Sequence, residues 1–372
     1  MDNGEDLYQK IEVDDDANKC RSLSVFIGTW NLHAQDPPPD LTDFIPPNQY
    51  DIYAIGTEEC GQSMEVAIVY DDKTKWENQL KQHMGSEWLP IQRITLNAIH
   101  LIVFLRRSLL PYISSNCASS VATGIGNIIG NKGGVGVSFY LGQTSLAFIN
   151  CHFHAHDSDI EQRNADFHMI NNTMNLLNST KRQSVSEFFD IVFWFGDLNY
   201  RINGGRRMVD NLLRRQMAEV MKANEQLGIE MRRGTVFSGF QEAEIRFAPT
   251  YKYDKNSDLY DTSTKQRVPS WTDRILWKAS DNIKNTGYNS TDTIRTSDHR
   301  PVTATFKISC NSGSKCVNPS GETHILLGAF WLESASGASD GFAQACARRV
   351  RRCIPITSEV QESDTSPPTT PR

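Results

Sequence analysis

The feature that most constrains the fold is a set of short apolar segments, each of strand length, that end in polar side chains. The run 191–195 is continuously apolar, and Gly196-Asp197-Leu198-Asn199 follows it directly. Runs of this length, rich in β-branched and aromatic residues, are typical of buried strands. By the same criterion we expect strands at 24–30, 51–56, 98–105, 134–140, 145–152, 271–277 and 302–308.

Helical periodicity appears between some of these runs. Residues 72–85 place Trp76, Leu80 and Met84 on one face, and helices are also expected at 161–177 and 209–225. Strands and helices do not alternate strictly, and no internal repeat is visible. This pattern favours an α/β fold in four layers, two packed mixed sheets flanked by helices, over a doubly wound parallel sheet.

Length and composition suggest one large domain with two tails. The chain has 372 residues, and we expect a flexible acidic N-terminus at 1–22, a catalytic domain at 23–308 and a disordered tail at 309–372. The eight cysteines form no C-x-x-C pair, and residues 1–20 do not form a secretory signal. We therefore expect a reducing, cytoplasmic setting and a monomer.

The net charge of −6 argues against nucleic acid as a partner and gives no general attraction to an anionic membrane. A polyanionic ligand would need a local basic patch. Cations do gather at 251–274, a stretch that contains Tyr251, Lys252, Lys265, Arg267 and Arg274.

Six of the expected strands carry polar groups at one end, where loops on a rigid scaffold concentrate catalytic side chains. Taken singly, an Asp-x-Asn after glycine is usually a turn, but six such ends together favour an active site. The residues concerned are Asn31, Glu59, His152, Asp197 with Asn199, Asp273, and Asp298 with His299.

These residue types suit metal-assisted hydrolysis of a phosphate ester. Carboxylate oxygens favour Mg²⁺, and Glu59 with Asn31 beside it is the expected ligand pair. Asp197 can deprotonate or orient the attacking water. Asn199 and His299 can donate hydrogen bonds to phosphoryl oxygens, and Asp273 can hold His299 in the required tautomer.

Longer motifs make the chain resemble a known family. They read WFGDLNYRI at 194–202 and PSWTDRIL at 269–276, with shorter matches GTWN at 28–31, NKGGV at 131–135, NCHF at 150–153 and SDHRPV at 297–302. In this order the motifs resemble the inositol polyphosphate 5-phosphatases of the exonuclease–endonuclease–phosphatase superfamily. Within that family, residues 200–276 are most similar to the type IV phosphoinositide 5-phosphatases.

The resemblance implies Mg²⁺-dependent removal of the 5-phosphate from phosphoinositides such as the 4,5-bisphosphate and 3,4,5-trisphosphate lipids, or from soluble inositol polyphosphates. It also implies peripheral contact with an anionic membrane. Glu59 would bind Mg²⁺, and Asp298 would lie against the metal or its waters. Lys132 would lie near the phosphate at position 1 of the ring. The groups surrounding the scissile phosphate would be Asn31, His152, Asn199 and His299.

The basic stretch gains a role from the same resemblance. Tyr251, Lys252, Lys265 and Arg267 would hold the ring phosphate next to the one removed, and Arg274 belongs to the same stretch. One departure is Glu58, where many members of the family carry Gln.

Several alternatives remain open from the sequence. A nuclease of the same superfamily would use a similar centre, and a phosphoinositide-binding scaffold would use the basic patch without turnover. His154 and His156 beside His152 suggest zinc only weakly, because no matching set follows. Residues 124–130 do not complete a dinucleotide-binding loop. The basic run 348–352 beside Cys353 is either a lipid-binding and palmitoylation site or a solvated tail.

Overall fold

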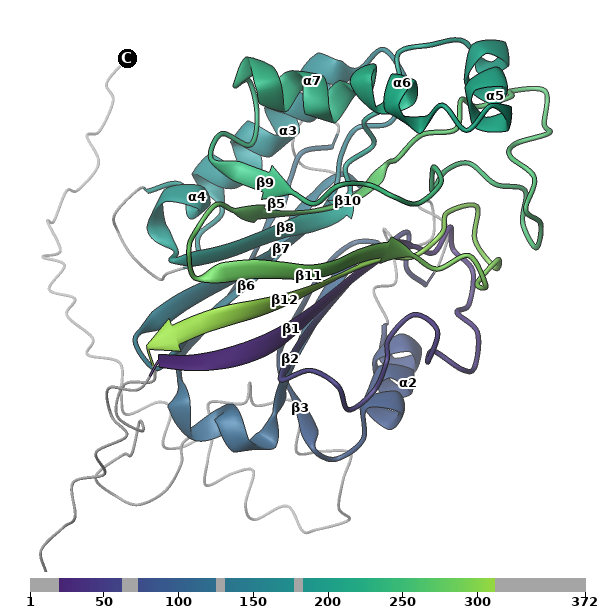
Figure 1. Ribbon diagram of the computed structural model, residues 1–372. Helices are drawn as coiled ribbons and strands as arrows, with labels where there is room; N and C mark the ends of the chain where they lie inside the picture. The colour runs from purple at the N-terminus through teal and green to yellow at the C-terminus, as the bar shows by residue number, and fades with distance from the viewer. Residues whose placement is uncertain (1–19, 62–72, 125–130, 177–182, 312–372) are drawn as a thin grey trace, which may run out of the picture. The chain divides into compact units, whose positions relative to one another are not determined.

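The structure, a computed structural model of the 372-residue chain, describes residues 20–61, 73–124, 131–176 and 183–311. Within these residues two six-stranded sheets pack face to face, and helices cover their outer faces (Figure 1). The expected four-layered α/β sandwich is therefore confirmed. The N-terminal residues 1–19 and the tail from 312 onward lie outside the described residues.

The first sheet has the order β11-β12-β1-β2-β4-β3. Only β1 and β2 pair in parallel, and every other neighbouring pair is antiparallel. The bounds are β1 (Cys20–Asn31), β2 (Ile52–Glu58), β3 (Trp88–Leu96), β4 (Ile99–Arg106), β11 (Ile283–Ser290) and β12 (Val302–Asn311).

The second sheet repeats this plan with the order β5-β6-β7-β8-β10-β9. Here β7 and β8 are the parallel pair, and the remaining pairs are antiparallel. The bounds are β5 (Ile113–Ala122), β6 (Gly133–Leu141), β7 (Thr144–His152), β8 (Ile191–Asp197), β9 (Phe240–Glu242) and β10 (Asp273–Lys278).

The main core lies between the two sheets, where alternate residues of each strand face inward. Val25 and Ile27 of β1 lie there with Phe148 of β7 and Phe193 of β8, all fully buried. The rings of Phe148 and Phe193 stack with their centroids 5.5 Å apart. This packing holds the strand ends of the two sheets in a constant relation, which the site requires.

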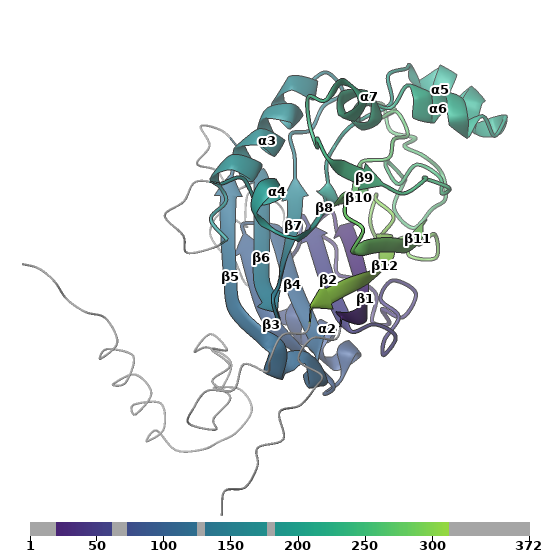
Figure 2. The same cartoon turned by 60° about the vertical axis from the view of Figure 1, so that its left-hand side comes forward.

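Helices cover the outer faces over two smaller cores. Helix α2 (Thr74–Met84) packs on the first sheet through Trp76, Leu80 and Met84, the face expected from its periodicity. Over the second sheet lie α3 (Ile160–Thr173), α4 (Val185–Phe188) and α7 (Gln226–Arg233). Figure 2 shows these helices along one side of the second sheet. The 3₁₀ helix η2 (Arg107–Tyr112) joins β4 to β5.

The prediction of a single helix at 209–225 is wrong. The chain instead forms α5 (Arg206–Arg214) and α6 (Ala218–Ala223), and Gln216 between them has a left-handed φ of 56°. Residues 214–220 are all exposed, so no core packing holds a continuous helix through them. The break places α5 and α6 at the end of the sheets where β8 ends, shown at the upper right of Figure 1.

All eight strands expected from the sequence are present. The pairing of β1 with β12 extends from Cys20 to Asn311, four residues before the expected start of β1 and three beyond the expected end of β12. Among the described residues, no helix is long and apolar enough to cross a membrane. The expected bounds of the catalytic domain stay a prediction.

Candidate active site

The polar strand ends converge at one end of the two sheets. In the first sheet Asn31 pairs with Glu58 at the carboxyl ends of the parallel strands, and β12 begins beside them, with Val302 opposite Thr29. In the second sheet His152 pairs with Asp197, and Asp273 at the start of β10 pairs with Asp197 from the other side. Antiparallel strands β10 and β12 thus begin where the parallel strands end.

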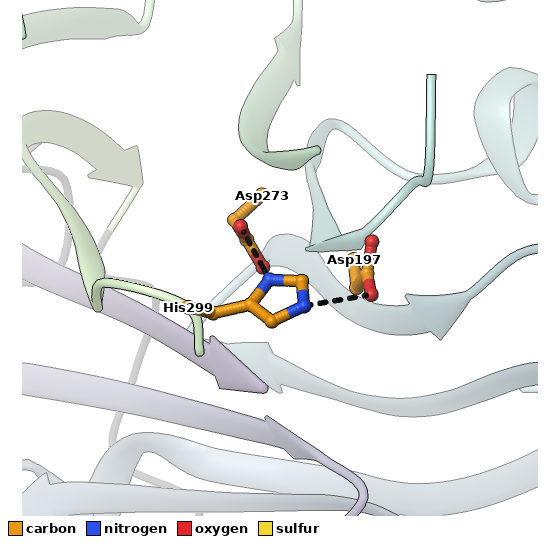
Figure 3. A group of neighbouring side chains, drawn as sticks. All are labelled: Asp197, Asp273 and His299. Atoms are coloured by element: carbon orange, nitrogen blue, oxygen red, sulfur yellow. Dashed lines mark hydrogen bonds and ion pairs between the residues drawn. The ribbon is translucent and has the colours of Figure 1, made fainter. Parts of the chain in front are cut away.

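Asp273, His299 and Asp197 form a line across this end (Figure 3). The Nδ1 atom of His299 lies 3.0 and 2.9 Å from the two carboxylate oxygens of Asp273. Its Nε2 points toward Asp197 Oδ2 at 4.0 Å, which is too long for a hydrogen bond. Asp273 is itself held by the hydroxyls of Thr250 and Thr272. The imidazole is therefore oriented by one carboxylate and presented to the other.

The burial of this line shifts its proton affinities. Burial raises the pKa of Asp197 to about 6, with Asp273 acting in the same direction and His299 opposing it. Burial lowers the pKa of His299, but the Asp273 carboxylate outweighs this and raises that pKa to about 10. Near neutral pH the pair is thus a carboxylate and an imidazolium, which is the charge state required of a general base beside an electrostatic donor.

Asn31 links Asp197 to Glu59. Its Nδ2 donates to Asp197 Oδ2 at 3.0 Å and to Glu59 Oε1 at 3.4 Å, and its Oδ1 accepts from the backbone N–H of His33. Burial acts to raise the pKa of Glu59, but a hydrogen bond from His33 and the charges of Lys132 and His299 hold it below its ordinary value. Glu59 is therefore anionic, and its side chain is 26% exposed.

Two groups of side chains are candidates for a metal ion. Asp197, Asp273 and His299 bring potential ligand atoms within 4.8 Å of one another. However, His299 uses Nδ1 on Asp273 and is protonated, so it is a poor ligand as it stands. Glu59, with Asn31 and Asp298 nearby, offers oxygen donors with access to water, which suits a hard divalent cation that keeps part of its hydration shell. The donor set fits Mg²⁺ better at Glu59.

Glu58 differs from its neighbour Glu59 in its burial and in the direction in which its pKa is shifted. It is fully buried, and Thr29 donates to it at 3.2 Å. Burial raises the pKa of Glu58 well above its ordinary value, assisted by the charges of Asp197 and Asp273. The side chain therefore favours the neutral acid.

Lys132 lies inside the candidate site, beside His152. Its side chain is buried, and Nζ lies 2.5 Å from His152 Nε2. Burial lowers the pKa of Lys132 to about 8, although Asp197 and Glu59 favour its charge. Burial and Lys132 together hold the pKa of His152 well below its ordinary value, so this histidine is neutral. The structure thus brings Lys132 toward the reacting centre, which the motif alone did not indicate.

Asn199 and Arg201 build the loop that follows β8. The backbone N–H of Asn199 donates to Asp197 Oδ1 at 3.1 Å, and one side-chain N–H donates to Phe153 O. The second N–H of that amide has no hydrogen-bond partner among the residues that the structure describes. Arg201 was not singled out from the sequence, yet it is buried, donates twice to Asn199 and stacks 4.5 Å from the Tyr251 ring. Its place inside a motif was the available signal.

Tyr251 and Lys252 contact residues of the site. Lys265 and Arg267, the other two residues of this basic stretch that are expected to bind substrate, follow them in the sequence. The Tyr251 ring lies 4.6 Å from the His299 ring, and Lys252 Nζ donates to Asp298 Oδ2 at 2.6 Å. Lys265 is exposed and Arg267 is half-buried; neither side chain pairs with any residue that the structure describes. Both remain available to an anionic ligand.

Arg274 corrects the sequence expectation. Its guanidinium is fully buried and bound to Glu225 at 2.8 Å and to Glu242, so all its nitrogens are occupied away from the site. Successive residues of a strand face opposite sides of the sheet, so Asp273 on the site side places Arg274 on the helix side. Arg274 therefore stabilises the packing of α7 on β10, and its nitrogens are already bonded to Glu225 and Glu242.

The extra histidines, the glycine-rich loop and the basic run near Cys353 add no residue to the described site. His154 is held by Asp166 at 2.8 Å and does not join His152 in a zinc cluster within the described residues. Residues 125–130 of the glycine-rich loop lie outside the described residues, as do Cys353 and the run 348–352.

Comparison with known proteins agrees with this geometry. The model of endonuclease/exonuclease/phosphatase family 2 matches residues 28–305. A human phosphatidylinositol polyphosphate 5-phosphatase type IV is 35% identical over 311 residues, covering 79% of this chain and 47% of the relative. The chain thus spans about half the length of the type IV relatives it matches.

Two solved structures are similar in fold. The inositol polyphosphate 5-phosphatase domain of a synaptojanin, in complex with inositol (1,4)-bisphosphate and calcium ion, has a TM-score of 0.71 and 28% identity, covering 91% of this chain and 94% of that domain. A Cimex nitrophorin in its ferrous NO complex has a TM-score of 0.61 at 21% identity, covering 77% and 99%. The second likeness shows the fold alone, because proteins that share a fold can differ in function.

This chain belongs to the endonuclease/exonuclease/phosphatase family, as the motifs predicted. Its relatives include phosphoinositide 5-phosphatases of types IV and II.

Proposed function

We propose that this chain hydrolyses the 5-phosphate of a phosphoinositide or soluble inositol polyphosphate, with Mg²⁺ as cofactor. The observation that carries the proposal is the Asp273–His299–Asp197 line. His299 Nε2 has no hydrogen-bond partner within 3.5 Å among the described residues, although the ring is protonated and only 4% of the residue is exposed. An unpaired cationic N–H beside a carboxylate is suited to an anionic ligand.

The proposed reaction uses each group at a stated atom. Asp197, anionic above about pH 6, takes a proton from the water that attacks phosphorus. His299 donates from Nε2 to a phosphoryl oxygen as negative charge develops, while Asp273 holds Nδ1. Asn31 and the backbone of Asn199 hold the Asp197 carboxylate in place. The water oxygen bonds to phosphorus, the bond from phosphorus to the ring oxygen breaks, and the ring oxygen takes a proton from solvent to become a hydroxyl. Inorganic phosphate leaves, and Asp197 returns its proton to solvent.

Mg²⁺ would be held by Glu59, with Asn31 and Asp298 nearby, and would supply charge neutralisation at the phosphoryl oxygens. The calcium ion named with the synaptojanin domain supports a divalent cation. Oxygen ligands with access to water favour magnesium among hard cations.

The substrate class is supported by the relatives and by the basic side chains at 252–267. The named relatives act on phosphatidylinositol polyphosphates and inositol trisphosphate, and the synaptojanin structure contains inositol bisphosphate. Lys252, Lys265 and Arg267 place three cations on one stretch beside Tyr251, as required to hold a second ring phosphate. Such a lipid substrate entails contact with a membrane surface.

The test is a turnover panel of phosphoinositides and inositol phosphates with the product isomer identified, run on wild type and Asp197→Asn. We expect Mg²⁺-dependent release of the 5-phosphate, lowered roughly 10²–10⁴-fold in kcat by the substitution. Release from another ring position would contradict the specificity. Faster cleavage of abasic DNA or RNA would instead indicate a nuclease, and lipid binding without turnover would indicate a scaffold.

A further inference from the structure

The exposed large hydrophobic side chains of this protein are not scattered. Among the described residues there are four, Met208, Met217, Val220 and Leu259, exposed by 44%, 41%, 38% and 63%. Single exposed apolar residues need no explanation. Here, however, three lie on the α5–α6 segment (204–223), and the fourth lies on the hairpin 253–260.

These two segments are joined directly. Arg206 at the start of α5 donates to the backbone carbonyls of Tyr260, Asp261 and Arg267 at 3.3, 2.8 and 3.1 Å. The hairpin follows Lys252, whose Nζ binds Asp298 in the site. In Figure 1 α5 and α6 lie at the same end of the sheets as the strand ends that form the site. The α5–α6 segment is thus attached to the stretch of chain that follows Lys252, at the end of the sheets that carries the site.

The charge of the α5–α6 segment opposes that of the whole chain. It contains five basic residues, Arg206, Arg207, Arg214, Arg215 and Lys222, and two acidic ones, Asp210 and Glu219, so its net charge is +3 in a chain of net charge −6. Arg207, Arg214 and Arg215 are exposed. Exposed arginines and exposed apolar side chains thus occur together on one short segment.

We propose that the α5–α6 segment, together with Leu259, docks on an anionic lipid bilayer and brings the active-site entrance to the membrane surface. Apolar side chains interspersed with arginine are typical of helices that lie in the membrane interface. A protein interface would instead be expected to have a contiguous apolar centre depleted of charge. This inference deepens the proposed function and rests on it for its purpose, because a lipid substrate is reached only at a membrane.

The experiment measures cosedimentation of the full chain with phosphatidylcholine vesicles containing phosphatidylserine and no phosphoinositide. Arg214→Gln/Arg215→Gln is expected to weaken binding roughly tenfold or more, since each basic residue near an anionic surface contributes about a fivefold factor. Met217→Ser/Val220→Ser is expected to weaken it by roughly tenfold. The matched control is Lys284→Gln/Lys307→Gln, which removes two exposed charges that face each other on β11 and β12.

A second readout separates docking from catalysis. Hydrolysis of a soluble inositol trisphosphate should be unchanged in all three variants, whereas hydrolysis of the same headgroup on vesicles should fall only in the α5–α6 variants. Unchanged vesicle binding in both α5–α6 variants, or an equal loss in the control, would overturn the docking proposal. If no variant and no wild-type preparation hydrolyses either substrate while vesicle binding follows the expected order, the proposed function fails and the docking surface stands.

Discussion

The two sheets share one plan but contribute different chemistry to the site. Each has a central parallel pair flanked by antiparallel strands, and each places polar residues where the parallel pair ends. The second sheet contributes His152, Asp197 and Asp273, all nearly free of solvent. The first contributes the buried Asn31 and His299 and also Glu59, whose side chain is a quarter exposed and lies 3.4 Å from the more exposed His33.

The difference separates two tasks that the proposed reaction requires together. In the dry end of the second sheet, electrostatic interactions are strong and shift proton affinities. At the wetter end of the first sheet, a cation can bind and keep part of its hydration shell. Asn31 connects the two ends, because its amide donates to both Asp197 and Glu59. Substitutions at the buried Asp197, Asp273 and His299 should therefore change proton transfer, and substitutions at the more exposed Glu59 should change the metal requirement.

The largest effect is expected from Asp273→Asn in the second sheet. Asp273 raises the pKa of both Asp197 and His299, so its neutralisation should move both limbs of the kcat–pH profile to lower pH. In wild type, activity should rise with pH through about 6, as Asp197 loses its proton, and fall through about 10, as His299 does. We also expect kcat to fall roughly 10²–10³-fold.

The control is Asp190→Asn, the same change at the other end of β8, where Asp190 accepts hydrogen bonds from Ser145. It should lower stability and leave the limbs of the profile in place. A profile that stayed unchanged in Asp273→Asn would show that the two sheets do not divide the work in this way.

The next effect concerns the first sheet. Glu59→Gln should raise the half-saturating Mg²⁺ concentration by at least the roughly 10–100-fold that loss of an outer metal partner costs. The acid limb of the pH profile should move little, because Asp197 remains intact. Activity titrated against Mg²⁺ gives the answer, with Glu58→Gln as the neighbouring control. A larger metal defect in Glu58→Gln than in Glu59→Gln would reverse the assignment.

The smallest effect is a gain in stability. The folded-state pKa of Glu58 lies well above its ordinary value, so the folded protein binds more protons than the unfolded chain once the pH exceeds that value. Stability is then lost as pH rises toward the folded pKa. Glu58→Gln has no proton to lose, so it should be the more stable protein at pH 8 and equal near pH 4. Urea unfolding in the presence of a chelator measures this, and an equal difference at both pH values would contradict it.

The pattern of strands recognised in the sequence has a physical cause. The eight strands expected from apolar runs are the eight interior strands of the two sheets, and the four not expected, β3, β5, β9 and β11, are the four edges. An edge strand buries less surface and tolerates polar residues and irregularities. Accordingly, β11 has only two buried residues, Ile283 and Tyr288, and contains a bulge, and β3 carries Pro90 next to a shift in register.

Sequence alone was sufficient for the family, the layered fold and the residues of the reacting line, because these depend on local apolar runs and on motifs in a definite order. Asp197, Asp273 and His299 follow from them. What only tertiary structure decided was how side chains far apart in sequence meet. Lys132 joins His152, Arg274 turns away to Glu225, and Arg201 stacks on Tyr251. Strand pairing decides which side of a sheet each residue faces, and burial then decides which proton it keeps.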